Sequence, residues 1–434
     1  RTGRPARAVT LLPQSVEDWR EFTLTRGPRM AAEAFLLKLA EMAPAEQRAA
    51  LCGLPDTRTL TRRFEEAWPL RESALGGVPF LTKDLYFRQH EPTFAGSTFL
   101  PQEIGAARAT SSLPAAFEGD AGAIECGRTQ LNEFAFGLSG ENPHYGDCPH
   151  PTRPDLLAGG SSSGSAFAVA RGLVPFALAT DTAGSIRVPC GTCGVWGLRL
   201  SPDVAPVGDI FPLSPGYDTQ GWIARSAGDL RQVSAAVLGE APPAGAGLWV
   251  GDLGLGIPAA DLAAMRAVAL KAGALEDDVA AATLLRLACA DAAEVYPVLG
   301  GHAAARVHAG WLERRRAEYD PVVWARLDAG RRRTYDELRT AEAARARISD
   351  AFRTIFRRHH FIALPATFGG AVSKAGTDDA HRRRLLALNA PASLAGLPVV
   401  AAPARLPDGR TAGVQFLFPD MANFGWDSVL GRLA

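Results

Sequence analysis

Two segments rich in small residues carry the residue types that nucleophilic chemistry needs. Residues 158–166 read Ala-Gly-Gly-Ser-Ser-Ser-Gly-Ser-Ala, and residues 180–189 read Thr-Asp-Thr-Ala-Gly-Ser-Ile-Arg-Val-Pro. Small residues let successive backbone N–H groups face one point, which creates an anion-binding concavity. A serine at that point, Ser185, could attack a carbonyl group while those N–H groups stabilise the oxyanion.

A serine nucleophile needs a base, and the sequence favours lysine over histidine for this role. None of the eight histidines lies in a recognisable Ser-His-Asp context. Lys83, one of four lysines, follows the strand-like segment 78–81 and precedes Asp84. Because burial lowers the pKa of a lysine, a lysine at the end of a buried strand can act as a base.

Three segments resemble the core motifs of the amidase signature family. They are residues 76–84 (Gly-Gly-Val-Pro-Phe-Leu-Thr-Lys-Asp), residues 159–165 and residues 181–189, and the 24-residue spacing from Ser161 to Ser185 also matches that family. Weaker similarity extends the resemblance from about residue 70 to residue 420. At position 183 many members of the family carry glycine, whereas this chain has alanine. Ala183, together with Ser163 in the first serine motif, resembles the allophanate hydrolase branch of the family.

The resemblance implies a Ser-Ser-Lys relay. Ser185 matches the acyl-forming nucleophile, Ser161 matches a bridging serine that the family holds at a cis peptide bond, and Lys83 matches the terminal base. The family's oxyanion hole corresponds to four consecutive backbone N–H groups, those of Thr182, Ala183, Gly184 and Ser185.

The implied activity is hydrolysis of a carboxamide C–N bond to a carboxylate and an amine or ammonia. The expected partner is a small-molecule amide, and no metal or organic cofactor is expected. Ser139 and the loop after it are candidates for lining the substrate site, and an ordinary surface loop explains them equally well.

Several other functions stay open at this point. The chain could hydrolyse a urea derivative such as allophanate or biuret, act as an amidotransferase subunit, or be a scaffold that has lost activity. A further alternative is an α/β-hydrolase esterase, because residues 160–164 also fit G-x-S-x-G with Ser162 as the nucleophile. That nucleophile would need a strand directly before it, and residues 152–158 do not have the pattern of a strand.

Two further patterns have structural interpretations that we favour. Cys190 and Cys193 form a C-x-x-C, but no second pair lies at zinc-finger spacing, so we expect core packing and no metal site. The arginine runs 331–333 and 382–384 are expected to be solvated helix faces, although the second could contact a carboxylate-bearing substrate.

The elements that must position these residues indicate an α/β protein. Helices are predicted up to residue 68 and over residues 258–355, and a strand followed by a helix is predicted over residues 119–137. Strands are predicted at residues 174–181, 361–364, 399–402 and 413–418. With the resemblance, this implies an amidase signature fold: a large mixed β-sheet covered by α-helices on both faces. We expect residues 1–68 to form a helical segment packed on a catalytic domain of residues 69–434.

Composition excludes several classes of protein. The 434 residues are 47% hydrophobic and 21% charged, which is typical of a globular protein and not of a disordered one. The formal net charge is zero, so the basic excess of nucleic-acid binders is missing. Six scattered cysteines and the lack of a long apolar segment favour a cytoplasmic protein without a membrane partner. A homodimer is an assembly that the sequence leaves open.

Overall fold

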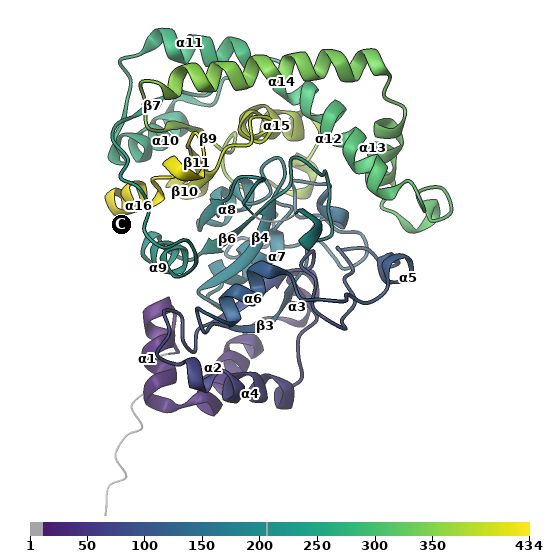
Figure 1. Ribbon diagram of the computed structural model, residues 1–434, viewed down its shortest axis with the longest axis vertical. Coiled ribbons are helices and arrows are strands. Elements are labelled where there is room, and N and C mark those ends of the chain that lie inside the picture. The colour runs from purple at the N-terminus through teal and green to yellow at the C-terminus, as the bar shows by residue number, and fades with distance from the viewer. Residues whose placement is uncertain (1–11, 205–206) are drawn as a thin grey trace, which may run out of the picture.

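A mixed sheet of eleven strands forms the centre of the structure, a computed structural model that describes residues 12–204 and 207–434 (Figure 1). The strand order is β1-β3-β2-β4-β6-β5-β10-β11-β9-β7-β8. The strands are β1 (Leu51–Cys52), β2 (Pro79–Lys83), β3 (Ile124–Thr129), β4 (Phe176–Asp181), β5 (Trp196–Arg199), β6 (Thr219–Ala224), β7 (Gly247–Trp249), β8 (Ala274–Leu275), β9 (Ile362–Pro365), β10 (Val399–Arg405) and β11 (Thr411–Leu417).

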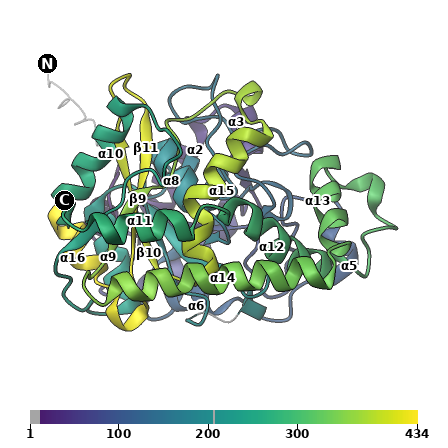
Figure 2. The ribbon, with the colours of Figure 1, turned by 90° about the horizontal axis from the view of Figure 1, so that it is seen from above.

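Helices cover both faces of this sheet, as the sequence predicts. In the described ranges they are α1 (Val16–Arg26), α2 (Pro28–Ala40), α3 (Pro44–Ala50), α4 (Thr57–Glu66), α5 (Leu100–Ile104), α6 (Ser112–Glu118), α7 (Ser163–Ala170), α8 (Arg187–Cys193), α9 (Ala227–Leu238), α10 (Ala259–Lys271), α11 (Val279–Ala288), α12 (Ala292–His308), α13 (Pro321–Arg331), α14 (Tyr335–Phe356), α15 (Asp379–Leu394) and α16 (Trp426–Leu433). Figure 2 shows α14 lying across the outside of this structure, where it packs against α11, α12 and α15.

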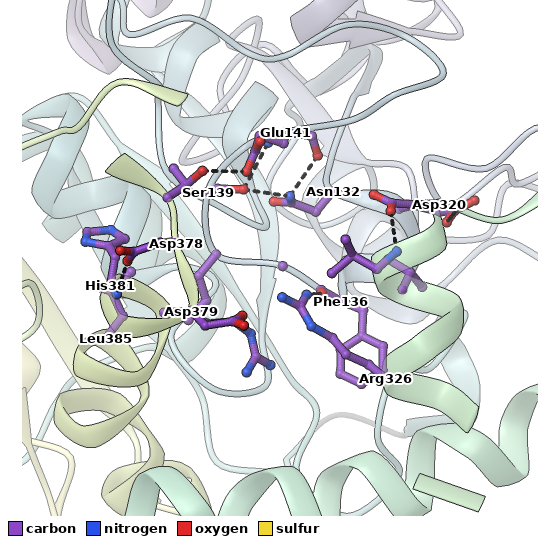
Figure 3. A pocket seen from close by; sticks show the side chains of 17 residues that line it. Asn132, Phe136, Ser139, Glu141, Asp320, Arg326, Asp378, Asp379, His381 and Leu385 are labelled. Atoms are coloured by element: carbon purple, nitrogen blue, oxygen red, sulfur yellow. Dashed lines mark hydrogen bonds between the residues drawn. The ribbon is translucent and has the colours of Figure 1, made fainter. Parts of the chain in front are cut away.

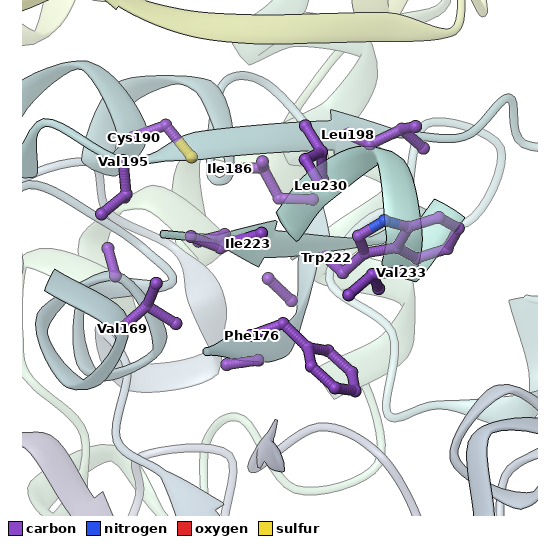
Figure 4. Packing of buried hydrophobic residues seen from close by; sticks show 14 of the residues in the cluster. Val169, Phe176, Ile186, Cys190, Val195, Leu198, Trp222, Ile223, Leu230 and Val233 are labelled. Carbon is purple, nitrogen blue, oxygen red and sulfur yellow. The ribbon is translucent and has the colours of Figure 1, made fainter. Parts of the chain in front are cut away.

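The pleat of the central strands separates two packed layers. On β6, Trp222 packs against α9, and its ring meets Phe117 of α6 at 5.6 Å. The next residue, Ile223, points to the opposite face, toward α7 and α8 (Figure 4). Successive strand residues point to opposite faces, so each central strand contributes to both layers and is apolar along its length.

The same alternation places Lys83 in the α7 layer. Phe80 of β2 stacks on Phe176 of β4, with ring centroids 5.2 Å apart, on the α6 face. Lys83 lies three residues further along β2, and therefore points to the other face. Strands β2 and β4 are parallel neighbours, so their carboxyl ends bring Lys83 and Asp181 to the same edge of the sheet.

Most predicted elements are present, but the helix predicted after the strand in residues 119–137 is wrong. Strand β3 forms there and is followed only by a 3-10 turn at Glu133–Ala135. Phe134 and Ala135 have φ values of 51° and 59°, which an α-helix cannot accommodate. The chain thereby turns away from the sheet and forms a wall of the cavity described below.

The N-terminal part of the chain is helical in α1 to α4, and it also contributes strand β1 at the sheet edge through antiparallel pairing with β3. The division of the chain at residue 68 stays a prediction. Within the two described ranges, no helix has the length and apolar character that crossing a membrane requires.

Helix α7 approaches its neighbours so closely that a glycine is required. A Cβ atom at Gly164 would lie 2.1 Å from the carbonyl oxygen of Ala50 and 2.7 Å from that of Gln130. We predict that Gly164→Ala lowers the free energy of unfolding by about 1–3 kcal/mol, because backbone must move to admit the methyl group. Urea-induced unfolding measures the change.

Gly228 is the matched control, since it also lies in the first turn of a helix, α9, and a Cβ there would have its nearest neighbour at 3.7 Å. Gly228→Ala should be neutral or stabilise the protein by up to about 1 kcal/mol. Equal effects of the two substitutions would contradict the close approach of α7.

Candidate active site

Lys83 lies at the centre of a buried cluster of hydroxyl groups. Its Nζ donates hydrogen bonds to Ser161 Oγ at 2.8 Å, Ser162 Oγ at 3.0 Å and Thr180 Oγ1 at 2.8 Å. The side chain is fully buried. Burial lowers the pKa of Lys83 to about 7, although the negative charges of Asp181 and Asp218 act in the opposite direction. A large share of this lysine is therefore neutral near neutral pH.

The two serines beside Lys83 differ in what else they contact. Ser162 donates its own proton to the carbonyl oxygen of Thr180 at 3.1 Å, which fixes the orientation of its hydroxyl group. Ser161 follows a cis peptide bond from Gly160 and accepts a hydrogen bond only from Lys83 among the described residues. The hydroxyl proton of Ser161 is thus free to be shared with Lys83 or with another group.

The strand that an α/β-hydrolase nucleophile would need before Ser162 is missing. Between β3 and α7 the described chain forms a 3-10 turn and one isolated bridge, Pro149 to Leu157. Ser162 is the N-cap of α7 and follows a loop. This geometry does not support the esterase alternative.

Ser185 lies on the loop between β4 and α8, and Asp181 shapes that loop. The Asp181 carboxylate accepts hydrogen bonds from the backbone N–H groups of Gly184 at 2.9 Å and Ile186 at 3.0 Å. Arg187 pairs with the same carboxylate at 2.8 Å, and Arg199 approaches it at 3.4 Å. Burial alone would raise the pKa of Asp181, but these cations and N–H groups hold it well below its usual range. A buried ion pair between Asp181 and Arg187 therefore braces the loop that carries Ser185.

Three of the four backbone N–H groups expected around Ser185 have no acceptor within the described chain: those of Thr182, Ala183 and Ser185. The fourth differs from the expectation, because the N–H of Gly184 donates to Asp181. Gly184 has a φ of 124°, and a Cβ atom there would lie 3.0 Å from Cβ of Asn389. The loop therefore leaves donors beside Ser185 that an oxyanion could use.

The links between the three predicted relay residues are not all formed. Lys83 and Ser161 are joined directly, whereas the Ser185 hydroxyl makes no hydrogen bond to Ser161 in residues 12–204. The Ser162 N–H donates to the Ser185 carbonyl oxygen at 3.2 Å and so ties the two serine segments together. The structure thus brings both segments against the end of β2.

A cavity of about 470 Å³ lies between α13 and α15 (Figure 3) and shares Arg382 with a smaller space at Ser185. Ser139 lines it, as the sequence analysis anticipated, and its Oγ accepts a hydrogen bond from Asn132 Nδ2 at 3.3 Å. A narrower space of about 20 Å³ leads to Ser185 and is lined by Thr182 and Ala183 on one side. Phe136 and Leu138 line both spaces and form the wall between them.

One arginine of this cavity, Arg382, differs from what the sequence predicts. The sequence favours a solvated helix face for it, but it is partly buried and lines both the cavity and the space at Ser185. Burial, together with the nearby Arg326 cation, lowers its pKa to about 10. Arg326 was not anticipated, because it lies on α13 in a segment without any motif. The other run behaves as predicted: Arg331 and Arg332 are exposed and pair with Asp328.

The C-x-x-C pair lies in the packed core. Cys190 and Cys193 are buried within the main hydrophobic cluster, and Cys193 Sγ donates to the carbonyl oxygen of Ala158 at 3.2 Å. No group of three His, Cys, Asp or Glu side chains that could hold a metal ion occurs among the residues that the structure describes.

Comparisons with known proteins agree with this geometry. A family model described as Amidase matches residues 31–245. Amidase 1 of Oryza sativa subsp. japonica is 39% identical over 170 residues, which cover 39% of this chain and 39% of the rice protein. The alignment thus spans about two fifths of that relative's length.

Two broader matches cover most of the chain. The 1-carboxybiuret hydrolase subunit AtzE of Pseudomonas sp. (strain ADP) is 31% identical over 376 residues, which cover 79% of this chain and 80% of that protein. A solved structure described as the crystal structure of an amidase superposes with a TM-score of 0.81 at 28% identity, and covers 96% of this chain and 98% of the other. The sheet, the serine-rich segments and these relatives together show that this chain belongs to the amidase signature family.

Proposed function

We propose that this chain hydrolyses the C–N bond of a small carboxamide through a serine acyl-enzyme. The observation that carries the proposal is the 2.8 Å contact between Lys83 Nζ and Ser161 Oγ, fully buried next to the Ser185 loop. A buried lysine surrounded by hydroxyl groups, with a lowered pKa, has the properties of a general base.

In the proposed reaction, Ser185 Oγ attacks the amide carbonyl carbon. Its proton passes to Ser161, and Ser161 passes its own proton to the neutral amine of Lys83. The C–N bond then breaks, and the proton returns through Ser161 to the leaving nitrogen, which leaves an acyl group on Ser185. Water attacks the acyl carbon by the same relay, releases the carboxylate and restores Ser185. We expect the link from Ser185 to Ser161 to tighten when substrate binds, as catalytic hydrogen bonds often do.

The backbone donors beside Ser185 support the same proposal. The N–H groups of Thr182, Ala183 and Ser185 are available to the oxygen that becomes negative when Ser185 attacks. Preorganised donors of this kind stabilise developing charge without any reorganisation during the reaction. We assign a structural role to the N–H group of Gly184, which holds the loop in place by donating to the Asp181 carboxylate.

Ser161 and Ser162 provide a matched pair of substitutions, since both contact Lys83 Nζ. Ser161→Ala should lower kcat/KM by about 10²–10⁴-fold, the contribution of a proton-transfer group. Ser162→Ala should cost far less, because its proton is already donated to Thr180. Steady-state kinetics on a common amide measure both values.

A fluorophosphonate probe followed by peptide mapping completes this test. The label should fall on Ser185 and disappear in Ser185→Ala. A label on Ser162, or equal losses in the two serine variants, would contradict the relay.

The pH dependence tests the role of Lys83. Because its folded-state pKa is lowered to about 7, the neutral, proton-accepting form predominates above that pH. An ammonium group has three donors and no acceptor, so kcat/KM should fall about tenfold per pH unit well below pH 7 and level off above it. Log kcat/KM against pH gives the midpoint.

Lys38 is the control for this experiment. It is also buried, its pKa is lowered to about 8, and it donates to the carbonyl oxygen of Gly172, which is not a partner of Lys83. Lys38→Met should leave the acid limb in place, whereas Lys83→Ala should remove it together with most of the activity. An acid limb that persists in Lys83→Ala would assign it to another group.

A second candidate is hydrolysis of a urea derivative. One relative that aligns with 79% of this chain is a 1-carboxybiuret hydrolase subunit, whereas the rice relative is an amidase. Turnover of allophanate and biuret against aliphatic and aryl amides distinguishes the two. We expect a simple carboxamide to be hydrolysed, and a strong preference for allophanate over benzamide would establish the second candidate instead.

A further inference from the structure

Arg382 is a partly buried cation that makes no ion pair within the described chain and lies beside the proposed nucleophile. It lies one turn into α15 and faces both the 470 Å³ cavity and the space at Ser185. Its Nε is buried and unpaired, and its guanidinium group forms no ion pair within the described ranges. Arg383, the next residue, is exposed and pairs with Glu294 at 2.7 Å.

The charges around Arg382 do not neutralise it. Arg326 adds a second cation to the cavity, and its Nη1 donates to the carbonyl oxygen of Phe136 at 2.6 Å. Of the acidic residues at the cavity, Glu133 accepts hydrogen bonds from His144 and from the N–H of Asp320. Asp379 is exposed, and its negative charge opposes the lowering of the Arg382 pKa, but no ion pair joins the two in the described chain.

The remaining acidic residues have structural partners. Asp320 and Asp378 cap α13 and α15 and accept backbone N–H groups, each at 2.7 Å. Glu141 accepts a hydrogen bond from Thr377 at 3.0 Å.

The space at Ser185 has one charged residue in its lining, and that residue is Arg382. The other walls come from backbone, from small residues and from apolar side chains that include Phe136, Leu213 and Leu386. A cation that is partly buried in such a setting loses part of its hydration, and an anion that reaches it offsets that cost. The guanidinium group matches a planar carboxylate, which it can hold with two parallel hydrogen bonds.

We propose that Arg382 binds a carboxylate of the substrate, so that the amide hydrolysed at Ser185 is a small, negatively charged molecule. This inference rests on the proposed function for the position of the reacting carbonyl group. The narrow space between Arg382 and Ser185 favours a short spacer between the carboxylate and the amide. Arg382 thereby selects the substrate, while Lys83 and the two serines act on its amide.

The test compares charged and uncharged amides of similar size. Oxamate, malonamate and succinamate place a carboxylate at increasing distance from the amide, and 4-oxopentanamide is an uncharged counterpart of succinamate. The wild-type protein should prefer one of the three anions by kcat/KM. We divide kcat/KM for the preferred anionic amide by kcat/KM for the uncharged amide. In Arg382→Gln this ratio should fall by about 10- to 150-fold, the range for a hydrogen bond to a charged group.

Two further variants show whether the charge at this position is responsible. Arg383→Gln removes a neighbouring arginine that points away from the cavity, and the ratio should stay at its wild-type value. Arg382→Lys keeps the positive charge but cannot make two parallel hydrogen bonds to a carboxylate. It should therefore show a preference for the anion between those of Arg382→Gln and the wild-type protein. An unchanged ratio in Arg382→Gln, or no preference in the wild-type protein, overturns the inference and leaves the proposed hydrolysis intact.

Binding without turnover separates this inference from the proposed function. In Ser185→Ala, calorimetry should detect binding of the preferred anionic amide. Adding Arg382→Gln should weaken this binding by a factor similar to the fall expected in the kcat/KM ratio. If the wild-type protein hydrolyses no amide and the probe does not label Ser185, the proposed function fails. Arg382-dependent binding would then still support the carboxylate site, and its absence would overturn it.

Discussion

The carboxylate of Asp181 holds together the segments that form the candidate site. It lies at the end of β4, accepts two backbone N–H groups of the Ser185 loop, and pairs with Arg187 on α8. Arg187 in turn donates to the carbonyl oxygen of Asn389 at 2.9 Å and to Gln415 Oε1 at 2.8 Å. One buried ion pair therefore connects β4, α8, α15 and β11. Removing one member of such a pair typically costs about 3–5 kcal/mol, because it leaves an uncompensated buried charge.

This ion pair and the lysine cluster lie close together but have opposite electrostatic character. Asp181 has several donors, so it stays charged and rigid, and the loop it holds keeps its backbone donors aligned. Lys83 has hydroxyl groups rather than carboxylates as hydrogen-bond partners, so burial lowers its pKa toward neutrality. An amine with a pKa near 7 is suited to acid–base chemistry near neutral pH.

The residues that line the cavity come from a different part of the chain than the residues of the proposed relay. The proposed relay residues lie between residues 83 and 185, on the parallel strands and the loops that follow them. The cavity walls come largely from the left-handed turn at Phe134 and from α13 and α15 (Figure 3). Different substrates can therefore be accommodated by changes in these helices while the lysine cluster stays the same.

The sequence by itself determined the family and the sheet-forming segments, and it predicted the residues that we propose carry the chemistry, because these depend on local patterns. Ser161, Ser185 and Lys83 lie in motifs of fixed spacing, and the apolar run of β4 is a signal of a buried strand. Only the tertiary structure decided that the Gly184 N–H serves Asp181, and that Arg382 faces the cavity while Arg383 faces outward. Adjacent arginines on a helix are alike in sequence. Which one lines the cavity depends on what packs against α15, and Arg326, which approaches from α13, is 56 residues away in the chain.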